Sequence, residues 1–162
     1  MSWKDTYKVW QERTDLEPDL KQELAAMSDD KEIEDAFYGP LSFGTAGMRG
    51  LMGPGINRMN VYTVRQATEG LATLMDSLGD DIKKRGVAIG YDSRHNSRKF
   101  AHDAARVLGA HGIKVYIYDN LRPTPELSFA VRHMGTYAGI MITASHNPKE
   151  YNGYKIYGED GG

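Results

Sequence analysis

The pattern of hydrophobic and polar positions divides the chain into a helical beginning and a longer part in which strands and helices alternate. Residues 5–13 and 17–38 carry apolar side chains at helical spacing. Glu17-Pro18-Asp19 has the early proline and the acidic side chains of a helix start. Residues 1–40 are therefore predicted to form a helical arm that packs on the outside of the domain that follows or against another part of a longer protein. The alternative is a solvated helical extension with no chemistry.

From residue 41 onward, short apolar runs alternate with longer segments of helical period. Asn60 can cap a helix that runs to Leu78, and Gly112 can end a helix that starts at Ser97. Strands are expected within residues 41–50 and at 87–91, 114–118, 138–142 and 153–157, with a short helix at 125–134. A strand, a helix and a strand within about 30 residues form a βαβ unit. The prediction is an α/β fold, a three-layer α/β/α sandwich with a mostly parallel mixed sheet, preceded by the N-terminal helical arm.

Length and composition narrow the class of protein. A chain of 162 residues can bury a core, and a single domain is expected. The chain has no cysteine, which excludes disulfides and thiolate metal sites. No segment approaches the roughly 20 apolar residues that a membrane-spanning helix needs. A cytoplasmic protein without a membrane partner is the default expectation.

Charge is distributed unevenly along the chain. Residues 1–40 contain 5 Lys/Arg and 11 Asp/Glu, whereas residues 41–162 contain 15 Lys/Arg and 11 Asp/Glu. The mildly basic later part suits a small anionic substrate. Its excess of positive charge is too small to indicate nucleic-acid binding.

The segment with the most informative chemistry is Thr-Ala-Ser-His-Asn-Pro at residues 143–148, directly after the apolar run 138–142. Because Asn-Pro favours a turn, Ser145 is expected on a sharp loop at the carboxyl end of a core strand, where open α/β sheets bind their ligands. A serine hydroxyl needs activation to act as a nucleophile. Residues near it donate hydrogen bonds or carry positive charge, which suits a serine that carries or attacks phosphate: His146, Asn147, Lys149 and Lys155.

Four motifs in this order and spacing resemble the first domain of the α-D-phosphohexomutases, the family of phosphoglucomutases and phosphomannomutases. They are Phe-Gly-Thr-Ala-Gly-Met-Arg-Gly at 43–50, Gly-Tyr-Asp-Ser-Arg at 90–94, Pro-Thr-Pro at 123–125, and the serine segment followed by Asn-Gly-Tyr-Lys at 152–155. The helical arm and the Phe-Gly-Thr-Ala-Gly form resemble the branch with bacterial phosphoglucomutases and phosphopentomutases. The resemblance implies that residues 41–162 are the catalytic phosphoserine domain, domain I, of a larger four-domain enzyme.

The resemblance also implies a reaction. The family's serine is phosphorylated in the resting enzyme and gives its phosphoryl group to a sugar monophosphate, which becomes a bisphosphate. The enzyme then takes back the other phosphate, so that phosphate moves between the 1 and 6 positions. By this resemblance Ser145 is the catalytic phosphoserine, His146 orients it or assists proton transfer, and Lys155 is the general acid/base or a phosphate contact. Positioning and charge neutralisation dominate such phosphoryl transfers.

The other candidate residues lie before the serine segment. Glycines at every third position in residues 43–50 can expose backbone N–H groups to an anion, and Arg49 can bind phosphate bidentately. Composition alone also allows a structural glycine-rich turn. The resemblance makes Arg49 catalytic and brings Thr45 and Gly47 to the transferring phosphate. The segment lacks the ending of a P-loop, so nucleotide binding is not implied.

Asp92 and Arg94 follow the strand at 87–91. One expectation is that the two residues pair locally and shape a turn. The other is that Arg94 lies within reach of the loop that carries Ser145 and that Asp92 holds Arg94 there. By resemblance Asp92, Arg94 and Asn147 belong to the substrate- and phosphate-binding residues.

The cofactors follow from the resemblance alone. The family binds Mg²⁺ through three aspartates of its second domain and the phosphoserine oxygen, so Ser145 would supply one ligand through its phosphate. Glucose 1,6-bisphosphate is the expected priming activator. The expected partners are a phosphosugar substrate and the remaining domains of the same enzyme, with no nucleic acid.

Several alternatives stay open. A phosphomannomutase or a phosphopentomutase of the same superfamily would share these motifs, because the sugar contacts lie in later domains. A serine hydrolase would need an activated nucleophile, but the Gly-x-Ser-x-Gly pattern is absent at Ser145. A non-catalytic phosphosugar-binding module is the third alternative.

Overall fold

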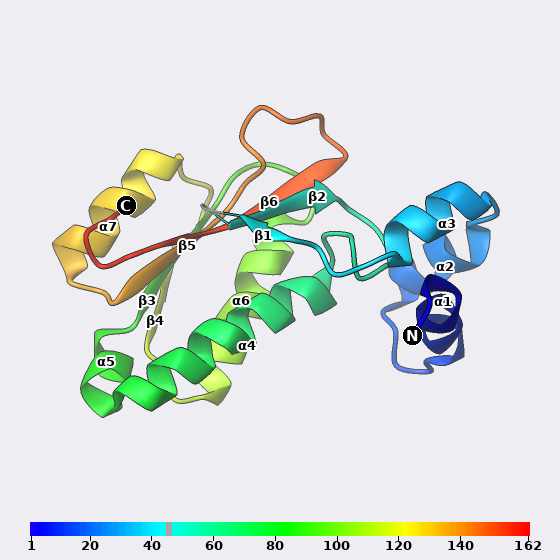
Figure 1. Ribbon diagram of the computed structural model, residues 1–162. Helices are drawn as coiled ribbons and strands as arrows, with labels where there is room; N and C mark the ends of the chain where they lie inside the picture. Colours follow the sequence, from blue (N-terminus) through cyan, green and yellow to red (C-terminus); the bar gives the residue numbers. More distant parts are fainter. Residues whose placement is uncertain (45–46) are drawn as a thin grey trace.

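The computed structural model describes residues 1–44 and 47–162 of the chain. Within them, a group of three helices precedes an α/β body (Figure 1). The helices are α1 (Trp3–Glu12), α2 (Pro18–Ala26), α3 (Asp30–Phe37), α4 (Val61–Leu78), α5 (Asp80–Arg85), α6 (Ser97–Ala110) and α7 (Thr124–Met134). The strands are β1 (Phe43–Gly44), β2 (Gly47–Leu51), β3 (Val87–Tyr91), β4 (Val115–Ile117), β5 (Ala138–Ile142) and β6 (Tyr151–Tyr157).

The six strands form one mixed sheet in the order β1-β2-β6-β5-β3-β4. Parallel pairing joins β3 to β4 and to β5, as expected for strands linked by helical crossovers. The other pairings, β1 with β2, β2 with β6 and β6 with β5, are antiparallel. The predicted mixed sheet is confirmed, but the expectation of mostly parallel strands holds only for β4, β3 and β5. The turn at 143–150 is too short for a parallel crossover, so β6 returns antiparallel to β5.

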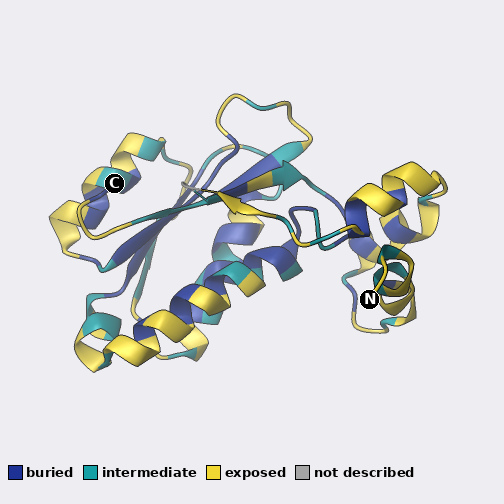
Figure 2. Ribbon diagram, in the orientation of Figure 1, coloured by how far each residue is buried: buried dark blue, intermediate teal, exposed yellow. Residues whose placement is uncertain are grey.

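Helices cover both faces of the sheet, which confirms the predicted three layers. Side chains of β3 alternate, so that Val87 and Ile89 pack under α4 and α6 while Ala88 faces α7. In the same way, Ile140 of β5 faces α4 and α6, and Met141 faces α7. Figure 2 shows the buried residues concentrated along these strands and on the inner sides of the helices. Burial of each of the valine, isoleucine and methionine side chains among them contributes about 1.5–3 kcal/mol.

The helix predicted for residues 17–38 is in fact two helices, and this expectation was wrong at its middle. Met27 is extended, with φ −70° and ψ 125°, and α2 ends before it. Asp29 then caps α3 by accepting a hydrogen bond from the backbone N–H of Lys31 at 3.1 Å. Ser28-Asp29-Asp30 is rich in residues that favour helix N-caps over helix interiors, which explains the break.

The helical arm has its own small core, separate from that of the body. Trp10 and Phe37 are buried in it, with ring centroids 5.6 Å apart. Trp10 also meets Tyr62 of α4 edge to face at 5.6 Å, which joins the arm to the body. Buried Arg58 pairs with Asp35 of α3 at 2.8 Å. The arm therefore rests against one end of the body (Figure 1).

The remaining boundaries follow local capping. Asn60 caps α4 as predicted, since its side chain accepts hydrogen bonds from the N–H groups of Tyr62 and Thr63. The sequence analysis missed α5, whose six residues are too few to give a helical period. Among the described helices, none is both long and apolar enough to cross a bilayer.

Candidate active site at the carboxyl end of the sheet

Ser145 lies where the central strand β5 ends. Thr143 and Ala144 stay buried, and the chain then turns so that Ser145 is exposed. Ser145 has a φ of 59°, in the left-handed region, where an L-residue costs roughly 1–2 kcal/mol. Its N–H donates to Thr143 Oγ1 at 3.0 Å. A serine held in this costly conformation by its surroundings is typical of a functional site.

The turn brings Ser145 and His146 together. Side chains of neighbouring residues point apart on an extended strand, but here Ser145 Oγ lies 3.2 Å from His146 Nδ1. The imidazole can therefore donate a hydrogen bond to the serine oxygen or accept its proton, depending on the tautomer. Within the described residues, His146 makes no hydrogen bond or ion pair with a carboxylate, which a hydrolase triad would require.

Arg94 holds the loop at residues 143–150 between β5 and β6, the serine loop, through hydrogen bonds to the loop's backbone. Its Nη2 donates to the carbonyl oxygens of Ser145 and Asn147, both at 2.6 Å. Its Nη1 donates to the carbonyl oxygens of Pro148 at 2.8 Å and Tyr151 at 3.1 Å. The expected proximity of Arg94 to this loop is present, and the contacts seen are with the loop backbone. A direct phosphate contact by Arg94 remains a prediction.

Asp92 contacts both the backbone and the guanidinium of Arg94. Its Oδ1 accepts a hydrogen bond from the Arg94 N–H at 2.9 Å, and its Oδ2 lies 3.5 Å from Arg94 Nε. Asp92 therefore pairs locally with Arg94 and shapes the turn after β3. Both expected roles of the pair, turn formation and support of Arg94 at the serine loop, coexist in the structure. Its membership of the phosphate-binding residues remains a prediction.

Arg49 and Asn147 are brought together from opposite ends of the sequence. Arg49 Nη1 donates a hydrogen bond to Asn147 Oδ1 at 2.9 Å. Arg49 is exposed on β2, whereas its neighbour Met48 is buried in the core, so Arg49 points to the opposite sheet face. The guanidinium thus lies beside the serine loop.

Gly47 is needed for close backbone packing. Its φ is 136°, and a Cβ there would lie 2.0 Å from the carbonyl oxygen of Tyr154. β2 can pair closely with β6 only without a side chain at this position. Thr45, also predicted to reach the transferring phosphate, lies outside the described residues.

Lys155 lies on β6 between Gly47 of β2 and Met141 of β5. Because Tyr154 points into the core, Lys155 faces the other side of the sheet, the side of Arg49. Lys155 is half-buried. No hydrogen bond joins it to Ser145 among the described residues, so its catalytic role remains a prediction.

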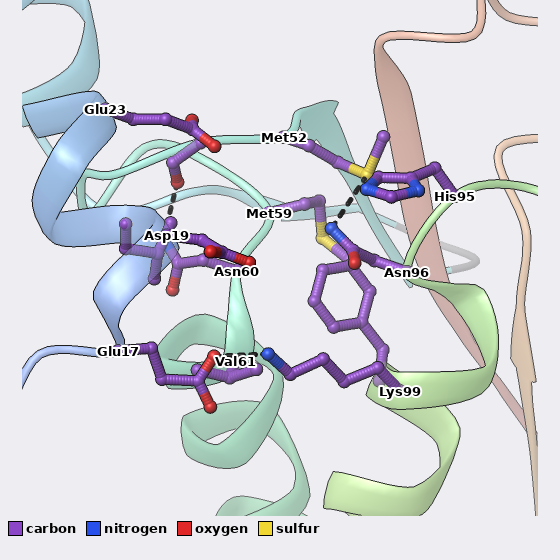
Figure 3. A pocket seen from close by; sticks show the side chains of 13 residues that line it. Glu17, Asp19, Glu23, Met52, Met59, Asn60, Val61, His95, Asn96 and Lys99 are labelled. Carbon is purple, nitrogen blue, oxygen red and sulfur yellow. Dashed lines mark hydrogen bonds and ion pairs between the residues drawn. The ribbon is translucent and has the colours of Figure 1, made fainter. Parts of the chain in front are cut away.

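A small pocket at the junction of arm and body is lined by acidic side chains, in contrast to the basic side chains around the serine loop. Glu17, Asp19 and Glu23 of the arm face His95 and Lys99 across it (Figure 3). Burial and the nearby Asp19 raise the pKa of Glu23, and His95 partly offsets this. The carboxylates make this pocket a poor place for a phosphosugar, whereas the serine loop is flanked by Arg49, His146 and Lys149.

The chain from residue 40 to residue 162 matches the family model for phosphoglucomutase/phosphomannomutase, alpha/beta/alpha domain I. It belongs to this family.

Individual proteins similar to this chain are also named as mutases. A phosphoglucomutase from Staphylococcus epidermidis is 47% identical over 146 residues, which cover 90% of this chain and 26% of that protein. A phosphopentomutase from Homo sapiens is 40% identical over 156 residues, covering 93% and 26%. A solved structure assigned as a phosphomannomutase from Thermus thermophilus has 35% identity and a TM-score of 0.67, covering 76% and 27%. The chain thus spans about a quarter of the length of these relatives.

The described residues of this family member hold no complete metal site. No group of three or more His, Asp or Glu side chains among them is arranged to hold a metal ion. Asp92, the carboxylate tied to the serine loop, is already engaged by Arg94 and Ser97. That Ser145 supplies one metal ligand through its phosphate remains a prediction.

Sequence reasoning missed two buried residues below the site. Ser97 Oγ donates to Asp92 Oδ1 at 2.7 Å, and Asn152 Nδ2 donates to Ser97 Oγ at 3.0 Å. Asn152 stands in the motif at 152–155, but residue type alone does not distinguish a buried structural amide from a site residue.

Proposed function

We propose that this chain is the phosphoserine-bearing domain I of a phosphohexomutase that interconverts glucose 1-phosphate and glucose 6-phosphate. The observation that carries the proposal is the geometry of Ser145. Its hydroxyl is exposed at the carboxyl end of β5, in a positive-φ turn, 3.2 Å from an imidazole nitrogen. Membership of the family supports phosphate as the group that this serine handles.

The first step moves a phosphoryl group from Ser145 to the sugar. A hydroxyl oxygen of the sugar monophosphate attacks the phosphorus, its bond to phosphorus forms, and the bond between Ser145 Oγ and phosphorus breaks. The sugar hydroxyl loses its proton to a base, and Ser145 Oγ takes up a proton. The bisphosphate then reorients, and Ser145 Oγ attacks its other phosphate in the reverse sense. The enzyme regains its phosphoserine, and the sugar leaves with phosphate at the other position.

The residues of the site have distinct parts in this proposal. His146 Nδ1 is placed to hydrogen-bond to Ser145 Oγ when the oxygen leaves phosphorus. Arg49 offers a planar guanidinium for the phosphoryl oxygens, and Asn147 orients it. Arg94 fixes the loop backbone. Lys155, on the same sheet face as Arg49, is the proposed general acid/base or phosphate contact.

Mg²⁺ and the sugar bisphosphate belong to the proposal as cofactor and activator. Phosphorylated Ser145 would give one oxygen ligand to Mg²⁺, with the remaining ligands outside this chain. Bound there, the ion would neutralise charge on the transferring group. Glucose 1,6-bisphosphate would charge an unphosphorylated Ser145. Further domains of the same enzyme are the proposed partners, and they would recognise the sugar.

Glucose is preferred over the alternatives for a specific reason. The phosphoglucomutase from Staphylococcus epidermidis is more similar to this chain than the human phosphopentomutase, although both match nearly all of it. A pentose phosphate is therefore the second candidate substrate.

The test is a mutase assay on the complete natural protein that contains this chain. Conversion of glucose 1-phosphate should require glucose 1,6-bisphosphate, and Ser145→Ala should abolish it without lowering the melting temperature. Ser93→Ala, which removes an exposed hydroxyl, is the matched control and should retain activity. Full turnover by Ser145→Ala would refute the proposal. Conversion of ribose 1-phosphate in place of glucose 1-phosphate would make the enzyme a phosphopentomutase.

A further inference from the structure

The serine loop is held mainly by one side chain from the turn that follows β3. Arg94 reaches four carbonyl oxygens between Ser145 and Tyr151, at 2.6–3.1 Å. Because these oxygens are spread over the loop, a rotation of the guanidinium would release several of them together. The conformation of Ser145 therefore depends on what fixes Arg94.

Arg94 is itself fixed by a chain of hydrogen bonds that begins at Asn152 and passes through Ser97 and Asp92. Asn152 Nδ2 donates to Ser97 Oγ at 3.0 Å, and Ser97 Oγ donates to Asp92 Oδ1 at 2.7 Å. Asp92 Oδ1 also accepts a hydrogen bond from the backbone N–H of Arg94 at 2.9 Å, and Asp92 Oδ2 lies 3.5 Å from Nε of the Arg94 guanidinium. The side chains of Asn152 and Ser97 are fully buried, so water does not compete for the hydrogen bond between them.

Asn152 is almost completely satisfied in this arrangement. Its second Nδ2 hydrogen bond goes to the carbonyl oxygen of His95 at 3.2 Å, and its Oδ1 accepts from the N–H of Gly153 at 2.8 Å. Three of its bonds thus fix the amide plane and, through it, the hydroxyl direction of Ser97. Satisfied buried networks of this kind specify one geometry, because any alternative leaves a buried polar group without a partner.

We propose that Asn152 and Ser97 are positioning residues for phosphoryl transfer, acting through Asp92 and Arg94 on the loop that carries Ser145. This inference rests on the proposed function, which it deepens. Neither residue touches Ser145, so their effect is on where the hydroxyl points. A displacement of about 1 Å at a reacting group can cost on the order of 10²-fold in rate.

A purely structural role makes a different prediction. Asn152 and Ser97 also tie β6 to the segment before α6, whose N-cap residue Asn96 makes no side-chain capping bond. If that were all, loss of the Ser97 hydroxyl would lower stability and leave turnover per folded molecule unchanged. The positioning role lowers kcat while the KM for the sugar phosphate stays the same.

The experiment compares Ser97→Ala with Thr136→Val in the complete natural protein. Thr136 is also fully buried and donates one hydrogen bond, to the carbonyl oxygen of Ala138 at 3.0 Å, at the opposite end of β5. We expect Ser97→Ala to lower kcat by about 10- to 100-fold with KM within about twofold, and Thr136→Val to leave both unchanged. Asn152→Asp, which keeps the acceptor for Gly153, should behave like Ser97→Ala.

Two further measurements make the result decisive. In an Arg94→Gln background, Ser97→Ala should change kcat less than about twofold, because both act through one side chain. Amide exchange at residues 145–147 should quicken in Ser97→Ala and not in Thr136→Val, and this readout needs no catalysis. A Ser97→Ala protein with wild-type kcat and wild-type exchange at 145–147 would overturn the inference. Absence of phosphate from wild-type Ser145 would instead overturn the proposed function.

Discussion

The guanidinium of Arg49 donates a hydrogen bond to the side-chain oxygen of Asn147 at 2.9 Å, although the two residues are 98 positions apart. This bond ties the glycine-rich strand β2 to the serine loop. β2 carries Arg49, and β5 leads into the serine loop. The positions of both strands are fixed by backbone pairing with β6, so the contact between Arg49 and Asn147 depends on the sheet register. It places the guanidinium of Arg49 beside the loop that carries Ser145.

Arg49→Ala in the complete protein should lower mutase turnover by about 10²-fold or more, the scale of losing one preorganised donor. Asn147→Ala keeps the guanidinium and removes only its anchor, so it should cost much less. Steady-state kinetics of the two variants measure the difference. Equal losses would mean that Arg49 serves only to hold Asn147.

Gly47→Ala should destabilise the body, because a Cβ would lie 2.0 Å from the Tyr154 carbonyl oxygen at a φ of 136°. We expect a loss of about 2 kcal/mol or more in the free energy of unfolding, on the scale of overpacking with backbone strain. Urea denaturation measures it. Gly70→Ala, at an open position within α4, is the control and should stabilise by up to about 1 kcal/mol. A neutral Gly47→Ala would contradict the close approach of β2 and β6.

The sequence predicted most of the body because its elements carry strong local signals. The apolar runs at 87–91 and 138–142 became β3 and β5 with the predicted bounds, and Asn60 caps α4. Antiparallel return of β6 and the break between α2 and α3 depend on turn chemistry that periodicity does not report.

The site was predictable in its members more than in its geometry. The sequence motifs predicted that five residues of the site lie near one another. The structure brings these residues together: Arg49, Arg94, Ser145, His146 and Asn147. The hydrogen-bond chain through Ser97 and Asn152 joins residues 55 positions apart, which only the folded sheet reveals. The approach of Lys155 to the serine remains a prediction.

Trp10→Ala should detach the arm from the body without unfolding the sheet. Its ring packs against Phe37 within the arm and Tyr62 of the body, and such truncations cost about 3–5 kcal/mol. Amide exchange should quicken in α1–α3 and stay slow in β3 and β5. Val9→Ala, at an exposed position on the same helix, should change neither. Equal loss of protection in the arm and the sheet would show that they form one cooperative unit.

Stability should depend on pH through His111. Its hydrogen bonds to Asp76 at 2.5 Å and Glu69 at 2.6 Å raise its pKa above the ordinary value of about 6.5. The protonated imidazole is favoured in the folded state, so its contribution is full below about pH 6.5 and is lost as pH rises through the raised pKa. The same contact lowers the pKa of Asp76, whose contribution is lost in acid.

His111→Gln should therefore reduce the melting temperature most at about pH 5–6 and progressively less as pH rises through the raised pKa of His111. Thermal unfolding of both proteins across this range measures the difference. His133→Gln serves as the control for removing a histidine from the surface of α7. A difference between wild type and His111→Gln that grows with rising pH would contradict the assigned direction.

The most direct test of the central claim is the mass of the peptide containing Ser145. The complete natural protein should be incubated with glucose 1,6-bisphosphate, digested and analysed by tandem mass spectrometry beside Ser145→Ala. We expect one added phosphoryl group, located on Ser145 in the wild-type protein and absent from the corresponding peptide of Ser145→Ala. A Ser145 that stays unmodified after purification from cells and after incubation with the bisphosphate would contradict the account.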